Sequence, residues 1–220
     1  HSPAEYPLAL QSGGSNPAEL VEATCQVKHL GFDEINLNLG CPSDRVQAGC
    51  FGAALMADPN RVSECFQAML NAAGTNGPKI TAKIRLGIDD QTPENTLPEF
   101  IDMLNSSNIK HVIIHARKAV LGGLSPKQNR TIPPLNYELV YFMKTQFPEM
   151  KIVLNGGLTS LDQCLEPLTR VDGVMVGRAA YQTPQLLLSV DRQFFQSEPP
   201  NRTAYDALLP YRPYVESVLA

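Results

Sequence analysis

The chain alternates between short apolar runs rich in β-branched residues and longer segments with apolar residues at helical spacing. We count about six runs of the first kind, which predict strands at 8–11, 35–39, 80–85, 111–115, 152–154 and 173–177. Helical spacing recurs between them, for example at 17–31, 59–74 and 161–171. This alternation predicts a parallel sheet with helices outside it.

The predicted helices begin and end at residue types that commonly cap helices. Ser15 or Asn16 precedes one helix and Ser160 precedes another, so a side-chain oxygen is available at each start. Gly31 and Gly74 stand where two helices are predicted to end. The caps therefore support the helices that the apolar spacing indicates.

A doubly wound sheet and a barrel both fit this pattern, and the placement of polar residues favours the barrel. In a barrel the carboxyl ends of all strands meet at one site, whereas in an open sheet only the strands at the switch point do. Nearly every predicted strand ends in a polar residue or glycine of chemical interest: Gln11, Asn38, Gly40, Cys41, Lys83, Arg85, His115, Arg117, Asn155, Gly156, Gly157, Gly177 and Arg178. We therefore predict an α/β fold of the TIM (β/α)8 barrel type.

A closed barrel has eight strands, but this chain supplies about six, and the first begins near residue 8. The first residue is not Met. We therefore expect residues 1–195 to form a barrel that lacks its first two βα units. The Pro-rich stretch after about residue 197 and the helical pattern at 207–220 predict that 196–220 form a linker and the beginning of a C-terminal helical domain.

The composition is that of a globular domain with one large core, with 43% apolar and 18% charged residues among 220. No apolar run approaches the roughly 20 residues that span a bilayer, and the first residues do not resemble a signal peptide. We expect a cytoplasmic protein. Five cysteines without a CxxC pair are expected to be reduced thiols, and we expect no metal site.

Two glycine-containing segments late in the chain, VLNGGL (153–158) and VDGVMVGRAAY (171–181), indicate a phosphate site. The loops after the last two strands of a barrel often bind phosphate through backbone N–H groups. Gly156, Gly157 and Gly177 allow that approach, and Arg178 adds a positive charge. These glycines are also common turn residues, but their recurrence in consecutive units favours a phosphate-bearing cofactor such as FMN.

Lys83 stands among apolar residues of a predicted strand, with Ala82 and Ile84 pointing away from it. A buried ammonium group needs an anion or an acceptor. We rank a carboxylate from a neighbouring strand second, because inner strand positions offer almost no Asp or Glu, and favour the pyrimidine edge of a flavin. His115 could be a core histidine and Gln11 a strand cap, but their positions at the carboxyl ends of strands favour ligand contact.

Cys41 directly follows a predicted strand and precedes Pro42, which puts it at the mouth of the site. An ordinary thiol is mostly protonated at neutral pH, so this cysteine is a candidate general acid. Cys25, Cys65 and Cys164 occupy helical positions among apolar neighbours and are expected to be inert. Cys50 is the serious rival.

These segments are similar to the tRNA-dihydrouridine synthase family from about residue 3 to residue 195. The strongest match is INLNLGCPSDRVQAGCFGAALM (35–56), followed in order by ITAKIRLG, VIIHARKA, SPKQNRTIPPL (125–135), VLNGGL and DGVMVGRAAY. SDRVQ and NRTIPPL resemble the bacterial branch that modifies uridines 20 and 20a. The resemblance implies reduction of the C5=C6 bond of a tRNA uridine.

The resemblance also implies roles for particular residues. Cys41 is expected to protonate C5 of uracil while reduced FMN delivers hydride to C6, with NADPH as the electron donor. The implied FMN-binding residues are Gln11, Lys83, His115, Asn155, Gly156, Gly157, Gly177 and Arg178. Asn38 is implied to contact the substrate nucleotide, and the C-terminal helical domain is implied to bind tRNA.

The net charge of −4 argues weakly against a nucleic-acid partner. A local basic patch, formed by Arg117, Lys118, Lys127 and Arg130, favours tRNA, and the resemblance implies that Lys127 and Arg130 touch it. We expect Arg117 to share that role, and we expect a monomer. Two rivals remain: a flavin dehydrogenase acting on a free small molecule, and a non-catalytic RNA-binding barrel.

Overall fold

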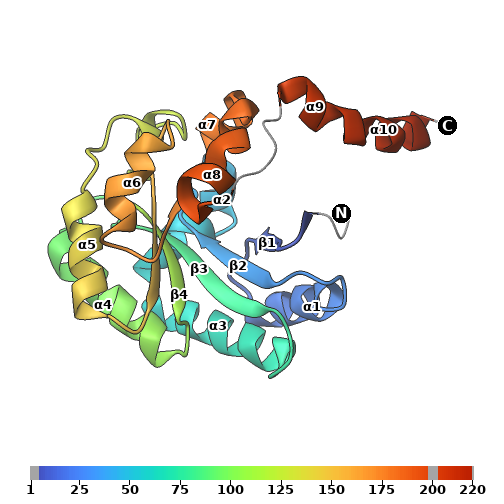
Figure 1. Ribbon diagram of the computed structural model, residues 1–220. Coiled ribbons are helices and arrows are strands. Elements are labelled where there is room, and N and C mark those ends of the chain that lie inside the picture. The colour runs from blue at the N-terminus through green and yellow to red at the C-terminus, as the bar shows by residue number, and fades with distance from the viewer. Residues whose placement is uncertain (1–4, 198–202, 220) are drawn as a thin grey trace.

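A computed structural model describes residues 5–197 and 203–219 of the chain. The described part contains one sheet of six parallel strands in the order β1-β2-β3-β4-β5-β6. These are β1 (Ala9–Ser12), β2 (Glu34–Leu39), β3 (Lys79–Arg85), β4 (His111–His115), β5 (Lys151–Asn155) and β6 (Gly173–Met175). The strand order never reverses and the sheet curls, as a half-barrel (Figure 1). The expected α/β architecture is confirmed to that extent.

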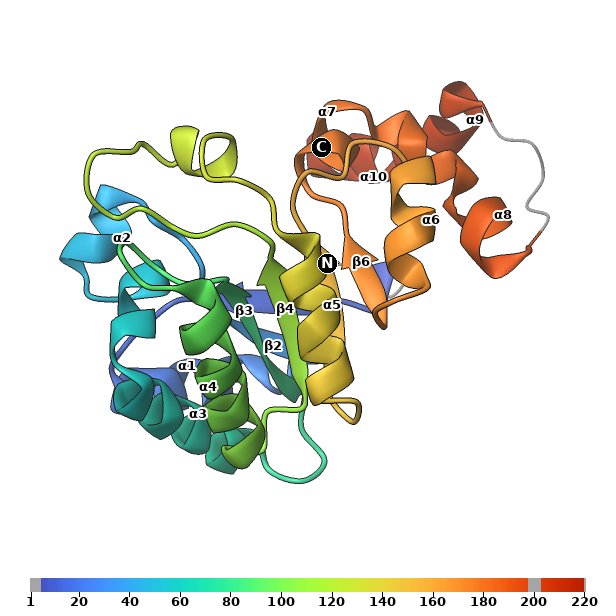
Figure 2. The ribbon, with the colours of Figure 1, turned by 90° about the vertical axis from the view of Figure 1, so that its left-hand side faces the viewer.

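Helices cover the outer face of the sheet, with α3, α4 and α5 side by side in Figure 2. The helices before β5 are α1 (Pro17–Val27), α2 (Asp44–Ala48), η2 (Gly52–Ala57), α3 (Pro59–Ala73), α4 (Pro93–Ser106), η3 (Gln128–Arg130) and α5 (Tyr137–Gln146). Those after β5 are α6 (Asp162–Leu168), α7 (Arg178–Gln182), η4 (Pro184–Ser189), α8 (Val190–Phe195), α9 (Ala204–Leu208), η5 (Leu209–Tyr211) and α10 (Arg212–Leu219). Helices α9 and α10 extend away from the sheet (Figure 1).

Alternation along the strands divides the sheet into an apolar outer face and an inner face that carries most of the polar residues. In β2, Ile35, Leu37 and Leu39 are at most 1% exposed and belong to the core. The residues between them, Asn36 and Asn38, point to the opposite face. Because the apolar set packs under the helices, the polar set is left to line the inside of the half-barrel.

The helix boundaries agree with the capping residues in part. Asn16 caps α1 by accepting a hydrogen bond from the backbone of Ala18, and Gly74 is the C-cap of α3. The prediction that the first helix ends at Gly31 was wrong, because α1 already ends at Val27. Ser160 is not the residue next to α6, which begins at Asp162, although its hydroxyl accepts from the backbone N–H of Gln163 at 3.4 Å.

The three cysteines expected to be inert differ in burial. Cys65 and Cys164 are buried, but Cys25 is exposed, because the polar side of α1 carries it. The expected linker includes residues 198–202, which lie outside the described residues. Among the described residues, no helix combines the length and apolarity that crossing a bilayer requires.

Phe66 tests the packing of α3 against the sheet, since its side chain is fully buried in the core. We expect Phe66→Ala to lower the free energy of unfolding by about 3–5 kcal/mol, because lost burial and a residual cavity add. Glu64→Ala on the exposed side of the same helix is the control and should change it by less than about 1 kcal/mol. Denaturant unfolding measures both, and equal losses would contradict this packing.

Candidate functional site

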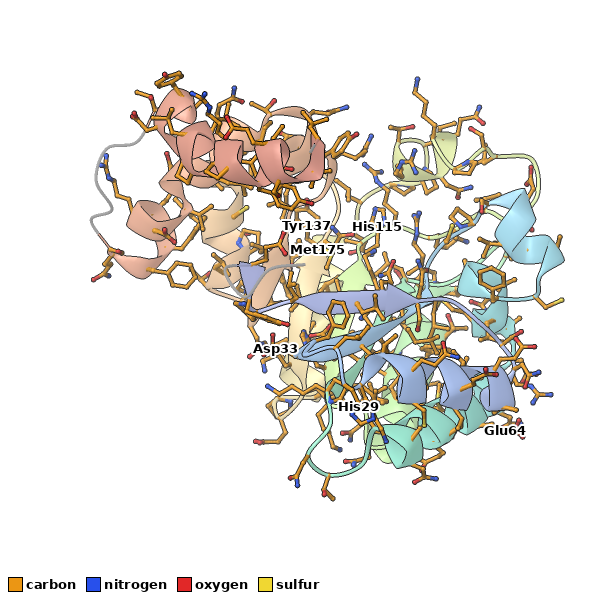
Figure 3. All side chains as sticks on the ribbon, turned by 90° about the vertical axis from the view of Figure 1, so that its right-hand side faces the viewer. His29, Asp33, Glu64, His115, Tyr137 and Met175 are labelled. Atoms are coloured by element: carbon orange, nitrogen blue, oxygen red, sulfur yellow. The ribbon has the colours of Figure 1, made fainter. Side chains whose placement is uncertain are left out.

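A cavity of about 570 Å³ opens at the carboxyl ends of the strands. Residues from all six strands or the loops that follow them line it, which is the convergence expected of a barrel. In Figure 3, His115, Tyr137 and Met175 lie together beside this region, while His29 and Glu64 lie away on the side of α1 and α3. The predicted site residues that line the cavity are Gln11, Asn38, Cys41, Lys83, His115, Arg130, Asn155, Gly156, Gly157, Gly177 and Arg178.

The loop after β2 holds Cys41 at the cavity. The side-chain oxygen of Asn38 accepts hydrogen bonds from the backbone N–H groups of Gly40 and Cys41, both at 3.0 Å. The thiol of Cys41 is half-buried and donates to the hydroxyl of Ser43 at 3.5 Å. Its rival Cys50 is exposed and lines a different cavity, beside Arg61. The geometry therefore favours Cys41 as the thiol of this site.

Arg85 ties the Cys41 loop to the basic loop after β4. Its guanidinium is 3% exposed and donates to the carbonyl of Gly40 at 3.0 Å, of Asn129 at 2.9 Å and of Lys118 at 3.4 Å. Burial, and next the charge of Arg130, lower the pKa of Arg85 to about 10. The group remains a cation at neutral pH, so Arg85 contributes a fixed positive charge as well as a bridge.

Asn129 shapes the basic loop from inside. Its side chain is fully buried, accepts from the backbone N–H of Val120 at 2.7 Å and donates to the carbonyl groups of Val120 and Leu124. Sequence reasoning missed this residue because a loop asparagine carries no sign of burial. The only available signal was its place in the segment NRTIPPL.

Lys83 faces the cavity without a carboxylate partner. Burial, and next the charge of Arg85, lower the pKa of Lys83 to about 8. The residues that line the cavity include no Asp or Glu. The inner face does contain one carboxylate, Glu34, but it pairs with His111 at 3.4 Å. The absence of a carboxylate beside Lys83 leaves the ammonium group free to bind an anion or an acceptor.

His115 is a neutral ring in a cationic environment. Burial, and next the charges of Arg85 and Lys83, lower the pKa of His115 to about 2. A β-carbon at Gly156 would lie 2.6 Å from the Cδ2 atom of this ring, and Gly156 has a φ of 110°. Glycine is therefore needed there for conformation and for space, so the plainer interpretation of that glycine is correct whether or not it also meets a ligand.

Gly177, which follows β6, differs from Gly156 in the space around it. No atom lies within 4 Å of the position of a β-carbon there, so this glycine faces open space. Asn155 donates to the carbonyl of Met175 at 2.8 Å, which joins the ends of β5 and β6. Arg178 follows at the cavity wall and is exposed. The arrangement leaves backbone N–H groups and one guanidinium accessible to an anion.

The basic patch divides between the cavity and the surface. Arg130 lines the cavity, and its Nε atom is buried without a hydrogen-bond partner among the described residues. Arg117 and Lys127 are not among the lining residues: Arg117 donates to the carbonyl of Pro133, and Lys127 is exposed. Lys118 donates to the carbonyl of Gln91 at 3.0 Å. The structure thus brings only Arg130 of this patch into the cavity.

Several contributors to the site were not predicted. Tyr137 donates its hydroxyl hydrogen to the carbonyl of Gly156 at 2.5 Å and so steadies the loop after β5. The lining residues that were not predicted are Pro42, Pro126, Leu158, Thr159, Met175, Ala179, Gln182 and Thr183. Most stand in loops, where no regular period indicates the direction of a side chain. In the described part, no group of three or more His, Cys, Asp or Glu could hold a metal ion.

Fold and site together define an α/β protein with parallel barrel-type strand order and a cationic, cysteine-bearing cavity at the carboxyl ends of its strands. The sequence model of the dihydrouridine synthase (Dus) family matches residues 1–218. The chain therefore belongs to the dihydrouridine synthase family, as the sequence motifs implied.

Bacterial relatives support this membership. The chain is 48% identical over 220 residues to a protein of Haemophilus ducreyi, covering 100% of the chain and 67% of the relative. It is 47% identical over 212 residues to one of Pseudomonas aeruginosa, covering 96% and 63%. It is 49% identical over 210 residues to one of Shewanella oneidensis, covering 94% and 62%. All three are named tRNA-dihydrouridine(20/20a) synthase, and the chain spans about two thirds of their length.

The neutral state of His115 predicts a pH dependence of stability. Because the folded-state pKa of His115 lies below its unfolded value of about 6.5, the unfolded chain gains the proton first and stability falls as pH drops below that value. Between pH 7.5 and 5.5 we expect the wild type to lose about 1.4 kcal/mol more unfolding free energy than His115→Gln. Denaturant titrations at both pH values measure this. The control, His29→Gln on the surface, should keep the wild-type pH dependence; an equal dependence in His115→Gln would contradict the burial.

Proposed function

We propose that the protein reduces the C5=C6 bond of a uridine in the D-loop of tRNA, at position 20 or 20a, with bound FMN and with Cys41 as the general acid. The observation that carries the proposal is the cavity itself. It contains Lys83, Arg85, Arg130 and Arg178, no carboxylate, and a thiol at its edge. Such a cavity favours anionic and electron-rich ligands, which describes both a flavin phosphate and an RNA backbone.

The residues present fit FMN. A volume of about 570 Å³ lies in the range of small-molecule sites. Gly177 faces open space, and Arg178 stands beside it, which suits a phosphate group. The side chains of Gln11 and Asn155 and the ammonium group of Lys83 supply donors and acceptors for a ring edge. His115, Gly156 and Gly157 line the same cavity, and we assign them to FMN contacts as well.

FMN, when bound, would provide the hydride for C6 of uracil, and we assign NADPH as the source of its electrons. Cys41 donates the thiol proton to C5, which completes the reduction and leaves a thiolate. A negative charge at Cys41 raises the pKa of both Lys83 and Arg85, so the two cations in turn stabilise that thiolate. His115 stays neutral and orients ligands rather than exchanging a proton.

The basic loop provides the tRNA contact. A uridine in a folded tRNA must leave its stack before its ring can approach a buried cofactor. We assign Arg130, at the cavity wall, to the phosphate next to that uridine, and Lys127 and Arg117 to the backbone further out. The Asn38 amide has a second hydrogen besides the one it donates to Gln11, and we assign that hydrogen to the substrate base.

The remaining assignments follow from the family. We propose that residues 1–195 belong to a flavin-binding (β/α)8 barrel and that 196–220 begin a helical tRNA-binding domain. We further propose a cytoplasmic monomer that uses no metal. The relatives are longer than this chain, which covers 67% and 63% of two of them. These assignments therefore concern the whole protein.

Cys41→Ala tests the acid. We expect this variant to bind FMN and to be reduced by NADPH, but to lose dihydrouridine formation by a factor of about 10² or more, because positioned proton transfer contributes that much. Nucleoside mass spectrometry of tRNA measures the product, and flavin absorbance measures binding and reduction. Cys50→Ala is the matched control and should keep wild-type yield. If Cys50→Ala lost dihydrouridine formation and Cys41→Ala kept it, Cys50 would be the general acid.

Charge reversal of the basic loop tests the substrate. We expect the double change of Lys127 and Arg130 to Glu to raise the KM for tRNA at least tenfold and to reduce its salt dependence, because phosphate contacts release counterions. NADPH oxidation without tRNA should persist. Lys79→Glu, at the opposite end of β3, is the control. An unchanged KM for tRNA would favour a small-molecule flavin dehydrogenase instead.

A further inference from the structure

A chain of hydrogen-bonded side chains crosses the inner face of β1, β2 and β3. Its members are Gln11 on β1, Glu34, Asn36 and Asn38 on β2, and Thr81 on β3. The parallel register places Asn36 opposite both Gln11 and Thr81. Because Glu34, Asn36 and Asn38 are two residues apart along one strand, they share the face opposite the apolar core.

The bonds form a continuous path from the amino ends of the strands to the Cys41 loop. The Asn38 amide donates to the Gln11 oxygen at 2.9 Å, and the Gln11 amide donates to the Asn36 oxygen at 2.9 Å. The Asn36 amide donates to the Thr81 hydroxyl at 2.7 Å, and that hydroxyl donates to Glu34 at 2.6 Å. We call these five side chains the amide relay.

The two ends of the amide relay impose the same direction on every bond. At one end, the N–H groups of Gly40 and Cys41 can only donate, so Asn38 must present its oxygen to them. Its amide nitrogen is then turned to Gln11, and each following amide must repeat that orientation. At the other end, a carboxylate can only accept, so Thr81 must give its hydrogen to Glu34 and receive one from Asn36.

The carboxylate end is held in its ionised form. Burial raises the pKa of the Glu34 carboxyl, but the hydrogen bonds from His111 and Thr81, with the charges of His111 and Lys151, outweigh it, and the pKa lies below its ordinary value. Asn36 and Thr81 are at most 2% exposed, so water does not compete for their bonds. The orientation of the whole relay therefore has a fixed starting point.

We propose that Asn36, Thr81 and Glu34 are positioning residues for Cys41: through the amide relay they set the orientation of the Gln11 and Asn38 amides and thereby the placement of the thiol. Neither Asn36, Thr81 nor Glu34 lines the cavity. The inference rests on the proposed function for its catalytic meaning, but the placement of Cys41 can be measured without flavin or tRNA. Reversing any amide in the relay would put two oxygens or two N–H groups face to face.

Two substitutions at Thr81 separate positioning from simple packing, each made in the full chain. Thr81→Val keeps the shape and removes the hydroxyl, so the Asn36 amide loses its acceptor and Glu34 loses a donor. Thr81→Ser keeps the hydroxyl and removes a methyl group. The first readout is the rate at which iodoacetamide alkylates Cys41, followed by mass spectrometry of its peptide, with exposed Cys50 as the internal reference.

We expect Thr81→Val to change the alkylation rate of Cys41 at least fivefold relative to Cys50, and Thr81→Ser to stay within twofold of wild type. With saturating FMN and NADPH, Thr81→Val should lower kcat for dihydrouridine formation about tenfold with a smaller change in the KM for tRNA. A Cys41 rate within twofold of wild type in Thr81→Val, or equal effects of the two variants, would overturn the proposal.

A second pair at the far end keeps the test decisive if Thr81→Val does not fold. Glu34→Gln retains an oxygen that accepts from Thr81, whereas Glu34→Met removes it. The same alkylation readout should change in Glu34→Met and be rescued in Glu34→Gln, and equal rates in these two variants would overturn the relay. If the wild type forms no dihydrouridine, the proposed function fails, while the alkylation rates still decide whether the relay positions Cys41.

Discussion

The buried guanidinium of Arg85 links the segments that form the mouth of the cavity. It donates to the carbonyl of Gly40 beside Cys41 and to carbonyl groups of Lys118 and Asn129 in the basic loop. Since all these partners are uncharged carbonyl groups, the positive charge of Arg85 is not neutralised by them. One residue therefore fixes the relative position of the thiol and the basic loop and also contributes to the positive potential between them.

That potential explains how a chain with a net charge of −4 can still present a site that attracts anions. The acidic residues are kept out of the cavity lining, while Lys83, Arg85, Arg130 and Arg178 converge on it. Burial, and next the repulsion from neighbouring cations, lower the pKa values of Lys83 and Arg85 to about 8 and about 10 and keep His115 neutral. Such a cluster of positive charges is electrostatically unfavourable while no anion is bound. An unfavourable cluster of this kind is expected at a site that binds an anion.

The sequence predicted the strands well, and the convergence of most proposed site residues on one cavity, because both depend on local pattern. The ends of the six strands were predicted to within one residue, apart from the end of β6, which was predicted two residues too late, and eleven of the thirteen proposed site residues line one cavity. Arg117 and Lys127 do not line that cavity, because side-chain direction in a loop depends on packing. Cys25 is exposed, because an apolar neighbourhood in sequence does not determine which side of a helix a residue occupies. No sequence pattern indicated the burial of Asn129 or the hydrogen-bonded partners of Glu34 on the inner face of the sheet.

By itself, the sequence determined the order of strands and helices, the choice of residues at the strand ends and the family to which the chain belongs, because periodicity and motifs are properties of neighbouring residues. Only the tertiary structure decided that Asn36 meets Gln11 and Thr81, that Arg85 reaches the carbonyl of Asn129, and that Cys41 rather than Cys50 faces the cavity. These contacts join residues that are distant in sequence, and strand register and burial, which no local pattern encodes, bring them together.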